Sequence, residues 1–161
     1  MQVSRAYIAG VADTRLNELE LRAWQALLHA HYDVTTTLDG ELRAEHALSW
    51  GSYDVLLRLA RAPANALRMS ELAERVLLSP SGLTRLVDQL EQDGLVERER
   101  TEEDARVVLA HLTERGRQAV RQAARTHVRG IREHFTGRLT RTQLRNLTSI
   151  LETITGPHEL H

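Results

Sequence analysis

The sequence predicts a mainly α-helical protein with a small β-hairpin wing, that is, a winged helix-turn-helix flanked by helices on both sides. Three observations lead to this fold class. Apolar residues recur every three or four positions over most of the chain, as on one face of an amphipathic helix. Near the middle, a short helix and a tight turn precede a second helix. Two segments with alternating apolar residues then surround an acidic turn, which is typical of a β-hairpin.

The first three helices are expected from their periodicity and caps. Residues 14–43 carry apolar residues at helical spacing and should form one long helix, which Gly40 weakens near its end. Ser49 is a suitable N-cap for a second helix. Ser70 is expected to cap a short third helix over residues 71–78.

A fourth helix follows directly. Ser79 can act as its N-cap, with Pro80 at the first helical position, where a missing N–H costs least. Gly94 is suited to a left-handed C-terminal cap. One face of this helix is expected to be buried through Leu83, Leu86, Val87 and Leu90.

The last two helices follow the hairpin. Thr113 begins a long helix, and a Thr140-x-x-Gln143 capping box begins another that ends at Gly156. The expected elements therefore divide the chain into residues 1–48 with the N-terminal helix, 49–112 with the winged helix-turn-helix, and 113–161 with the C-terminal helices.

Composition bears on several classes of protein. The 161 residues include no cysteine, which excludes disulfides, thiolate metal sites and thiol redox sensing. The sequence contains neither an apolar run of membrane-spanning length nor the apolar segment of a secretory signal, so a cytoplasmic protein without a membrane partner is expected. It also has no G-x-S-x-G elbow and no Gly-rich phosphate loop, so an enzyme is not expected.

The start of the fourth helix is the part that points to a function. Ser79, Pro80, Ser81 and Gly82 contribute almost nothing to a core, whereas small residues and free N–H groups at a helix start allow close approach to a DNA phosphate. Thr84 and Arg85 lie opposite the apolar face, where they could reach base edges or phosphates. The alternative is a well-capped helix start without a ligand.

Residues 67–120 carry several motifs in a fixed order. These are Leu72-Ala73, Ser-Pro-Ser-Gly-Leu-Thr-Arg-Leu-Val from position 79, Asp-Gly-Leu-Val from 93, Asp104-x-Arg106 and Leu-Thr-Glu-x-Gly from 112. In this order and spacing the segment resembles the DNA-binding core of the MarR family. The resemblance implies a homodimeric winged-helix transcription regulator that binds a palindromic site in double-stranded DNA, with repression as the usual role.

In that family the Asp-x-Arg motif lies in the wing. Carried over to this sequence, Arg106 would enter or border the minor groove and Asp104 would orient it, while Ala105 replaces a second arginine that the family often has. Arg75 and Arg98 are further candidate DNA contacts. A surface ion pair of a β-turn is the alternative for Asp104 and Arg106.

The charge of the winged segment opposes DNA binding. Residues 61–112 contain 7 Arg against 10 Asp and Glu, whereas residues 113–145 contain 9 Arg against 2. We therefore expect modest non-specific affinity and greater dependence on specific contacts. A winged-helix module that binds protein without specific DNA binding remains the alternative function.

The outer helices have apolar stripes that the winged module cannot cover alone. The resemblance implies that they interlock in a two-fold dimer, and a monomeric helical cap is the alternative. The residues assigned to dimerisation are Leu16, Leu19, Leu144, Leu147, Leu151 and Ile154.

MarR-like proteins often bind a small phenolic or anionic ligand between the dimer helices and the winged domain. The candidate ligand-binding residues, for which ordinary packing is the alternative, are Trp24, His29, Tyr32, Trp50 and Tyr53. No metal site or cofactor is expected, because His29 and His31 face different directions on a helix and cysteine ligands are lacking.

Overall fold

The computed structural model describes residues 15–76, 79–100 and 107–156. The chain divides into two compact units, Met1–Asp33 and Val34–His161, and the boundary between them falls within the first helix.

Helix α1 spans Glu18–His46, so it begins and ends later than residues 14–43, the predicted range. Gly40 does not interrupt it, because the helix is exposed there and a glycine in open space costs only intrinsic propensity. The chain leaves the helix at Ala47, which has a φ of 55°. Side chains up to Asp33 are exposed, whereas Leu38 and Leu42 are buried.

Helix α2 spans Trp50–Arg61 and is capped as predicted, since the Ser49 hydroxyl accepts a hydrogen bond from the Ser52 amide at 3.0 Å. A 3₁₀ turn, Pro63–Asn65, follows. It leads into a short strand that the sequence analysis did not predict, β1 at Ala66–Arg68.

Helix α3 spans Met69–Arg75, and its N-cap position is Arg68 without a side-chain cap. The prediction that Ser70 caps this helix is therefore wrong. The helix begins as soon as β1 ends, so Ser70 already lies inside its first turn.

Helix α4 spans Pro80–Gln92, and both of its predicted ends are confirmed. The Ser79 hydroxyl accepts a hydrogen bond from the Gly82 amide at 3.2 Å. Gly94 has a φ of 68°, the left-handed conformation in which glycine is least strained.

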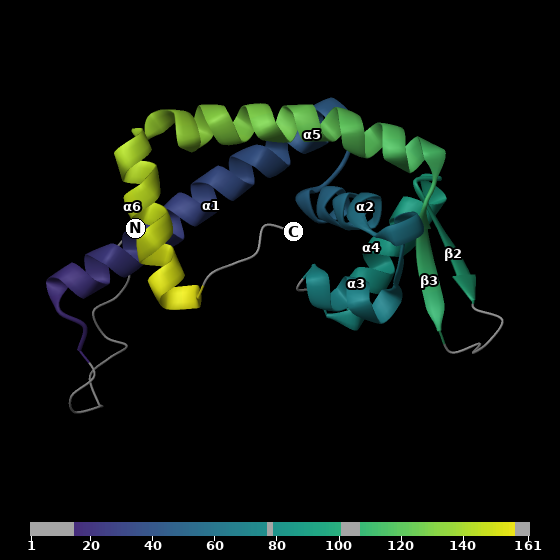
Figure 1. Ribbon diagram of the computed structural model, residues 1–161, viewed down its shortest axis with the longest axis horizontal. Helices are drawn as coiled ribbons and strands as arrows, with labels where there is room; N and C mark the ends of the chain where they lie inside the picture. The colour runs from purple at the N-terminus through teal and green to yellow at the C-terminus, as the bar shows by residue number, and fades with distance from the viewer. Residues whose placement is uncertain (1–14, 77–78, 101–106, 157–161) are drawn as a thin grey trace. The chain divides into compact units, whose positions relative to one another are not determined.

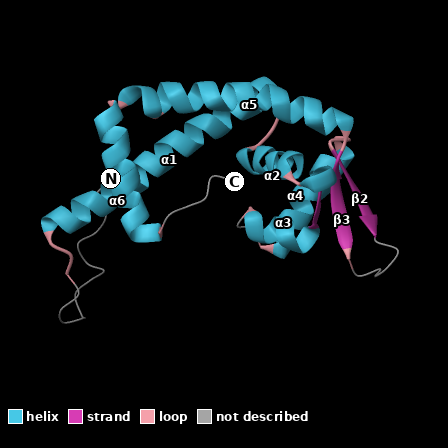
Figure 2. Cartoon of the chain, in the orientation of Figure 1, coloured by secondary structure: helices cyan, strands magenta, loops and turns pink. Residues whose placement is uncertain are grey.

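The predicted hairpin is present as β2 at Val96–Arg100 and β3 at Val108–Leu112. The strands pair antiparallel with Val96 opposite Leu112 (Figure 2). Strand β1 adds to the other edge of β3, so the described strands form one sheet in the order β1-β3-β2.

Helix α5 spans Glu114–His134 and is capped by Thr113, as predicted. After the 3₁₀ turn Thr136–Arg138, helix α6 spans Arg141–Thr155 and begins with the predicted Thr140–Gln143 capping box. Figure 1 shows α5, in green, passing over α2 toward the hairpin.

The hydrophobic core lies within the winged helix-turn-helix and against the parts of α1 and α5 that pack on it. Its largest fully buried side chains come from the end of α1, from α2, α3 and α4, and from the hairpin: Leu42, Val55, Leu56, Leu59, Leu72, Leu83, Val87, Leu90 and Val96. Over the part of the chain that the structure describes, α6 buries none of its side chains.

Polar bonds fasten the second half of α1 to α5. The buried Thr126 hydroxyl donates a hydrogen bond to Glu45 Oε2 at 2.8 Å and lies 2.8 Å from His46 Nε2. Since that hydroxyl hydrogen goes to Glu45, His46 Nε2 must be the donor of the second bond. Arg129 also pairs with Glu45, so the end of α1 is held on α5 by charged and neutral bonds together.

Candidate nucleic-acid interface

The first turns of α4 present one buried face and one exposed face. Leu83 and Val87 are buried in the core, whereas Thr84 and Arg85 are exposed. Hydrophobic packing of the first pair fixes the direction in which the second pair points. Two functional side chains thus project from a rigid helix rather than from a loop.

The tip of α4 is small and accessible. Ser79, Pro80 and Ser81 are exposed, and Gly82 is half-buried. A Cβ atom added at Gly82 would lie 3.1 Å from the Ser79 hydroxyl oxygen, so the glycine keeps room for the capping side chain. A helix start of this kind combines positive partial charge with a surface that a bulky anion can approach.

Thr84 and Arg85 offer complementary chemistry. The Thr84 hydroxyl donates a hydrogen bond to the Pro80 carbonyl at 2.8 Å, so it presents an acceptor oxygen and a methyl group to the outside. An acceptor suits the amino groups of adenine and cytosine, and a methyl group suits thymine. The Arg85 guanidinium meets no carboxylate among the described residues, so its donors face outward.

Arg98, which is predicted to contact DNA, is half-buried and pairs with two carboxylates of α4. Its Nη2 lies 2.7 Å from Asp88 Oδ1 and 2.6 Å from Glu91 Oε2, and its backbone amide donates to Glu91 Oε1 at 3.2 Å. The hydrogen bond from Arg98 holds the pKa of Glu91 below its usual range. Arg98 therefore fastens strand β2 to α4, and its charge offsets part of the negative charge of Asp88 and Glu91.

Of the other residues predicted to contact DNA, only Arg75 lies within the described ranges. Arg75 is exposed in the last turn of α3. Asp104 and Arg106 lie outside the described residues.

A groove of about 330 Å³ opens where β1, α4 and the hairpin meet. Its walls are formed by Arg68, Met69, Ser70, Thr84, Arg98, Val107 and Val108. Sequence reasoning missed Arg68, because a three-residue strand has too few positions for alternation to reveal it.

Two of the predicted ligand-binding residues converge on a histidine that sequence reasoning also missed. The ring centroid of His127 lies 4.9 Å from that of Trp50 and 5.0 Å from that of Tyr53. Burial lowers the pKa of His127, and its Nδ1 has no hydrogen-bond partner in the described part of the chain. The sequence did contain a signal: Val120, Ala123, His127 and Gly130 recur at the spacing of one helical face.

The other predicted ligand-binding residues lie in the first half of α1, within the other compact unit. Trp24, His29 and Tyr32 are exposed there. Trp50 and Tyr53 therefore form one cluster with His127, whereas Trp24, His29 and Tyr32 belong to the unit Met1–Asp33.

Two wider properties complete the description. Throughout the described ranges, no helix is long and apolar enough to cross a membrane. Nor do those ranges contain a group of three or more His, Asp or Glu side chains placed to hold a metal ion.

Comparisons with known proteins relate this arrangement to a family. A MarR family sequence model matches residues 48–107. The structure is similar to AbsC of Streptomyces coelicolor, a MarR family transcriptional regulator, with 33% identity, a TM-score of 0.82, and coverage of 88% of this chain and 96% of AbsC. It is also similar to Sco3205 of the same organism, a MarR family regulator solved in complex with DNA, with 31% identity, a TM-score of 0.82, and coverage of 88% and 92%.

A curated relative shows a shorter match. The chain is 31% identical over 94 residues to YkoM of Bacillus subtilis (strain 168), an uncharacterised HTH-type transcriptional regulator. The matched part is 58% of this chain and spans 59% of the length of YkoM.

Proposed function

Since the chain belongs to the MarR family of winged helix-turn-helix transcription regulators, we propose that it acts as a homodimeric repressor of the cytoplasm that binds a palindromic operator in double-stranded DNA. The observation that carries this proposal is the exposed start of α4, where Thr84 and Arg85 project from a helix whose other face is locked into the core. The similarity to Sco3205, which was solved with DNA, supports the same assignment.

The first turns of α4 would enter the major groove. Arg85 is the candidate reader of guanine, and Thr84 the candidate contact for an amino or methyl group. The small residues from Ser79 to Gly82 would lie against the sugar–phosphate backbone, which positions the helix. Asp104, Arg106 and Arg98 stay candidate contacts of the wing, and Arg75 stays a candidate contact of α3.

Two-fold symmetry would place two such helices on successive turns of the duplex. Support comes from apolar side chains that this chain leaves exposed: Leu19 is 77% exposed and Ile154 70%. Leu16 is exposed as well, and Leu144, Leu147 and Leu151 are half-buried. Burying this surface in a second copy would remove apolar area from water, the main driving force for association.

A small phenolic or anionic ligand would release the operator. The cluster of Trp50, Tyr53 and His127 supports a site between α2 and α5, because it combines aromatic surface with a buried nitrogen that lacks a partner among the described residues. Trp24, His29 and Tyr32 stay candidates on α1. A ligand beside Trp50, Tyr53 and His127 would act on the contact between α2 of the winged domain and α5.

The test is direct binding to DNA. Fluorescence anisotropy of the purified protein with DNA from beside its own gene should give saturable binding that weakens as salt is raised, and scrambled DNA should bind less tightly. A reporter fused to that DNA should then be less active when the protein is expressed. No preference over scrambled DNA, followed by no enrichment in a genome-wide pull-down of bound fragments, would contradict the proposal and favour a protein-binding module.

A further inference from the structure

We propose that Arg68 contacts a phosphate of the DNA backbone from the groove between the recognition helix α4 and the hairpin. This inference rests on the proposed function and adds a contact that lies outside the helix-turn-helix itself. It commits the groove to one occupant, the phosphodiester backbone of bound DNA.

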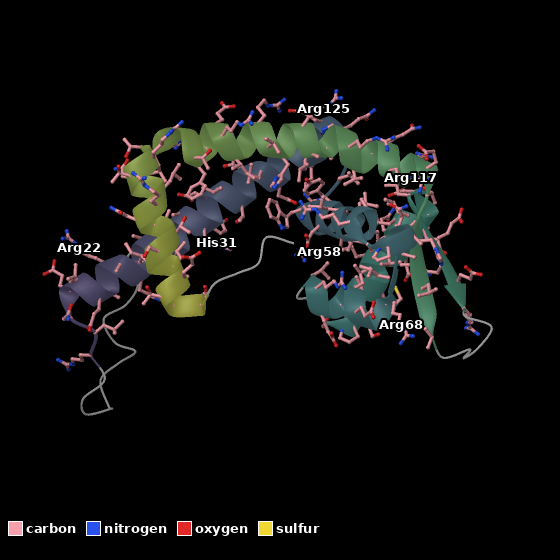
Figure 3. The ribbon with its side chains drawn as sticks, viewed as in Figure 1. Arg22, His31, Arg58, Arg68, Arg117 and Arg125 are labelled. Atoms are coloured by element: carbon pink, nitrogen blue, oxygen red, sulfur yellow. The ribbon has the colours of Figure 1, made fainter. Side chains whose placement is uncertain are left out.

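The first argument is the position of Arg68. It is the last residue of β1, the strand at one edge of the sheet, and it lies opposite Leu109 of β3. Its side chain is exposed, and Figure 3 shows it at the lower edge of the winged domain beside α3 and the hairpin. The pairing of β1 with β3 thus fixes an arginine level with Leu109, near the end of the hairpin that lies away from the Val96–Leu112 pair.

The second argument is that the groove joins Arg68 to the recognition helix. Thr84 of α4 forms part of the same wall. If Thr84 faces a base edge in the major groove of DNA, the phosphates that flank this base would lie at the opening of the protein groove that contains Arg68. An arginine at this point would fix the depth and register of α4 without reading a base itself.

The two arginines of the groove differ in whether a carboxylate already balances their positive charge. The groove also contains Arg98, but the carboxylates of Asp88 and Glu91 already bind its guanidinium. The side chain of Arg68 makes no ion pair or hydrogen bond with any residue that the structure describes. Arg68 is therefore the arginine of this groove whose charge is left for an anion, and a planar guanidinium suits a phosphate through two parallel hydrogen bonds.

The fourth argument is the remaining surface of the groove. Ser70 supplies a hydroxyl, whereas Met69, Val107 and Val108 supply apolar surface. Apolar surroundings exclude water from one side of the ion pair and strengthen it. The Thr84 hydroxyl donates to the Pro80 carbonyl, so Ser70 is the hydroxyl better placed to donate beside Arg68.

The experiment measures the salt dependence of DNA binding by wild type, Arg68→Ala and Arg68→Lys. Arg115→Ala is the matched control: it removes one exposed arginine in the first turn of α5, beside Gly94 and so at the opposite end of α4 from Ser79. Each phosphate contact contributes roughly 0.9 to the slope of log affinity against log salt, so a dimer lacking two contacts should lose about 2. Arg68→Ala should also weaken operator and scrambled DNA by the same factor, roughly tenfold at near-physiological salt.

Arg68→Lys should keep most of the slope because it keeps the charge. It thereby separates a lost contact from a lost fold, as does thermal unfolding of each variant. Arg115→Ala should leave the slope close to that of wild type.

The outcomes distinguish this inference from the proposed function. A wild type that does not bind DNA overturns both. A wild type that binds, with Arg68→Ala equal to it in affinity and slope, overturns only the inference. A loss confined to the operator with an unchanged slope also overturns it, because that pattern would mean that Arg68 reads a base.

Discussion

The imidazole of His127 packs edge-on against the indole of Trp50, with ring centroids 4.9 Å apart and planes inclined at 72°. The contact joins α5 to the first residue of α2, so it links the C-terminal helices to the winged domain. Tyr53 packs on the same imidazole, and burial of the ring disfavours its protonated form.

Acid should weaken this junction. Burial lowers the pKa of His127 below its ordinary value of 6.5, with a smaller opposing effect from Asp54. Between the folded and unfolded pKa values the unfolded chain binds more protons, so the free energy of unfolding falls as pH drops below about 6.5. The melting temperature of wild type should therefore fall more between pH 8 and pH 5 than that of His127→Gln. His29→Gln, which changes an exposed histidine, should behave as wild type; equal falls in all three proteins would contradict the assignment.

Removing Arg98 should loosen the wing. Arg98→Ala leaves Asp88 and Glu91 side by side without their cation, and the side chain of Arg98 is only 29% exposed. We expect a loss of about 1 kcal/mol in the free energy of unfolding, measured by urea denaturation. Arg43→Ala, which breaks an exposed pair with Asp39 within one helix, should cost less than about 0.5 kcal/mol. The sequence-based role for Arg98 would regain support if Arg98→Ala left stability unchanged but weakened DNA binding.

Two glycines of long helices should respond to alanine with opposite signs. A Cβ atom at Gly116 would lie 2.1 Å from the Leu95 carbonyl oxygen, and backbone cannot give way as a side chain can. Gly116→Ala should therefore destabilise the protein by about 1–3 kcal/mol. Gly40 has nothing within 4 Å of such an atom, so Gly40→Ala should stabilise by about 0.5–1 kcal/mol through helix propensity. Chemical denaturation of both variants measures the contrast, and the same sign in both would refute it.

Arg85→Ala should abolish preference for the operator while leaving the fold intact. The side chain is exposed and packs on nothing in the core, so the melting temperature should stay within a degree or two of wild type, as expected for a surface change. Loss of a bidentate base contact should cost roughly 1–3 kcal/mol per half-site. Anisotropy with operator and scrambled DNA measures the difference. A variant that still prefers the operator as wild type does would remove Arg85 from the base-reading residues.

Charge on the exposed apolar stripe should disrupt the dimer. Ile154→Glu places a carboxylate where we propose that a second copy packs, so the mass measured by light scattering should fall toward that of one chain. Ser149→Glu adds the same charge about 140° away around α6, by helical spacing, and should leave the mass unchanged. An unaltered mass for Ile154→Glu would contradict the role of this stripe.

Local chemistry accounts for what sequence reasoning predicted well. The Ser79 cap, the Thr140–Gln143 capping box and the left-handed Gly94 each depend on residues within a few positions along the chain. The buried face of α4 also follows from spacing alone, because a helix of 3.6 residues per turn aligns Leu83, Val87 and Leu90.

The errors have a common physical origin in long-range contacts. Ser70 was expected to cap α3, but pairing of β1 with β3 starts the helix before that residue. The ion pairs of Arg98 were missed, because the fold brings two carboxylates of α4 to it. The contact of His127 with two aromatic rings of α2 was missed, because it joins α2 to α5 across more than 70 positions of the sequence.

By itself the sequence determined the helices with most of their caps, the hairpin and the family, because these follow from local propensity, periodicity and motif order. Only the tertiary structure decided which charged side chains are already paired and which are left for a ligand. That distinction separates Arg98 from Arg68 and Arg85. It depends on two carboxylates of α4, ten and seven positions before Arg98, that the turn between α4 and β2 brings to its guanidinium, so the periodicity of one element does not show it.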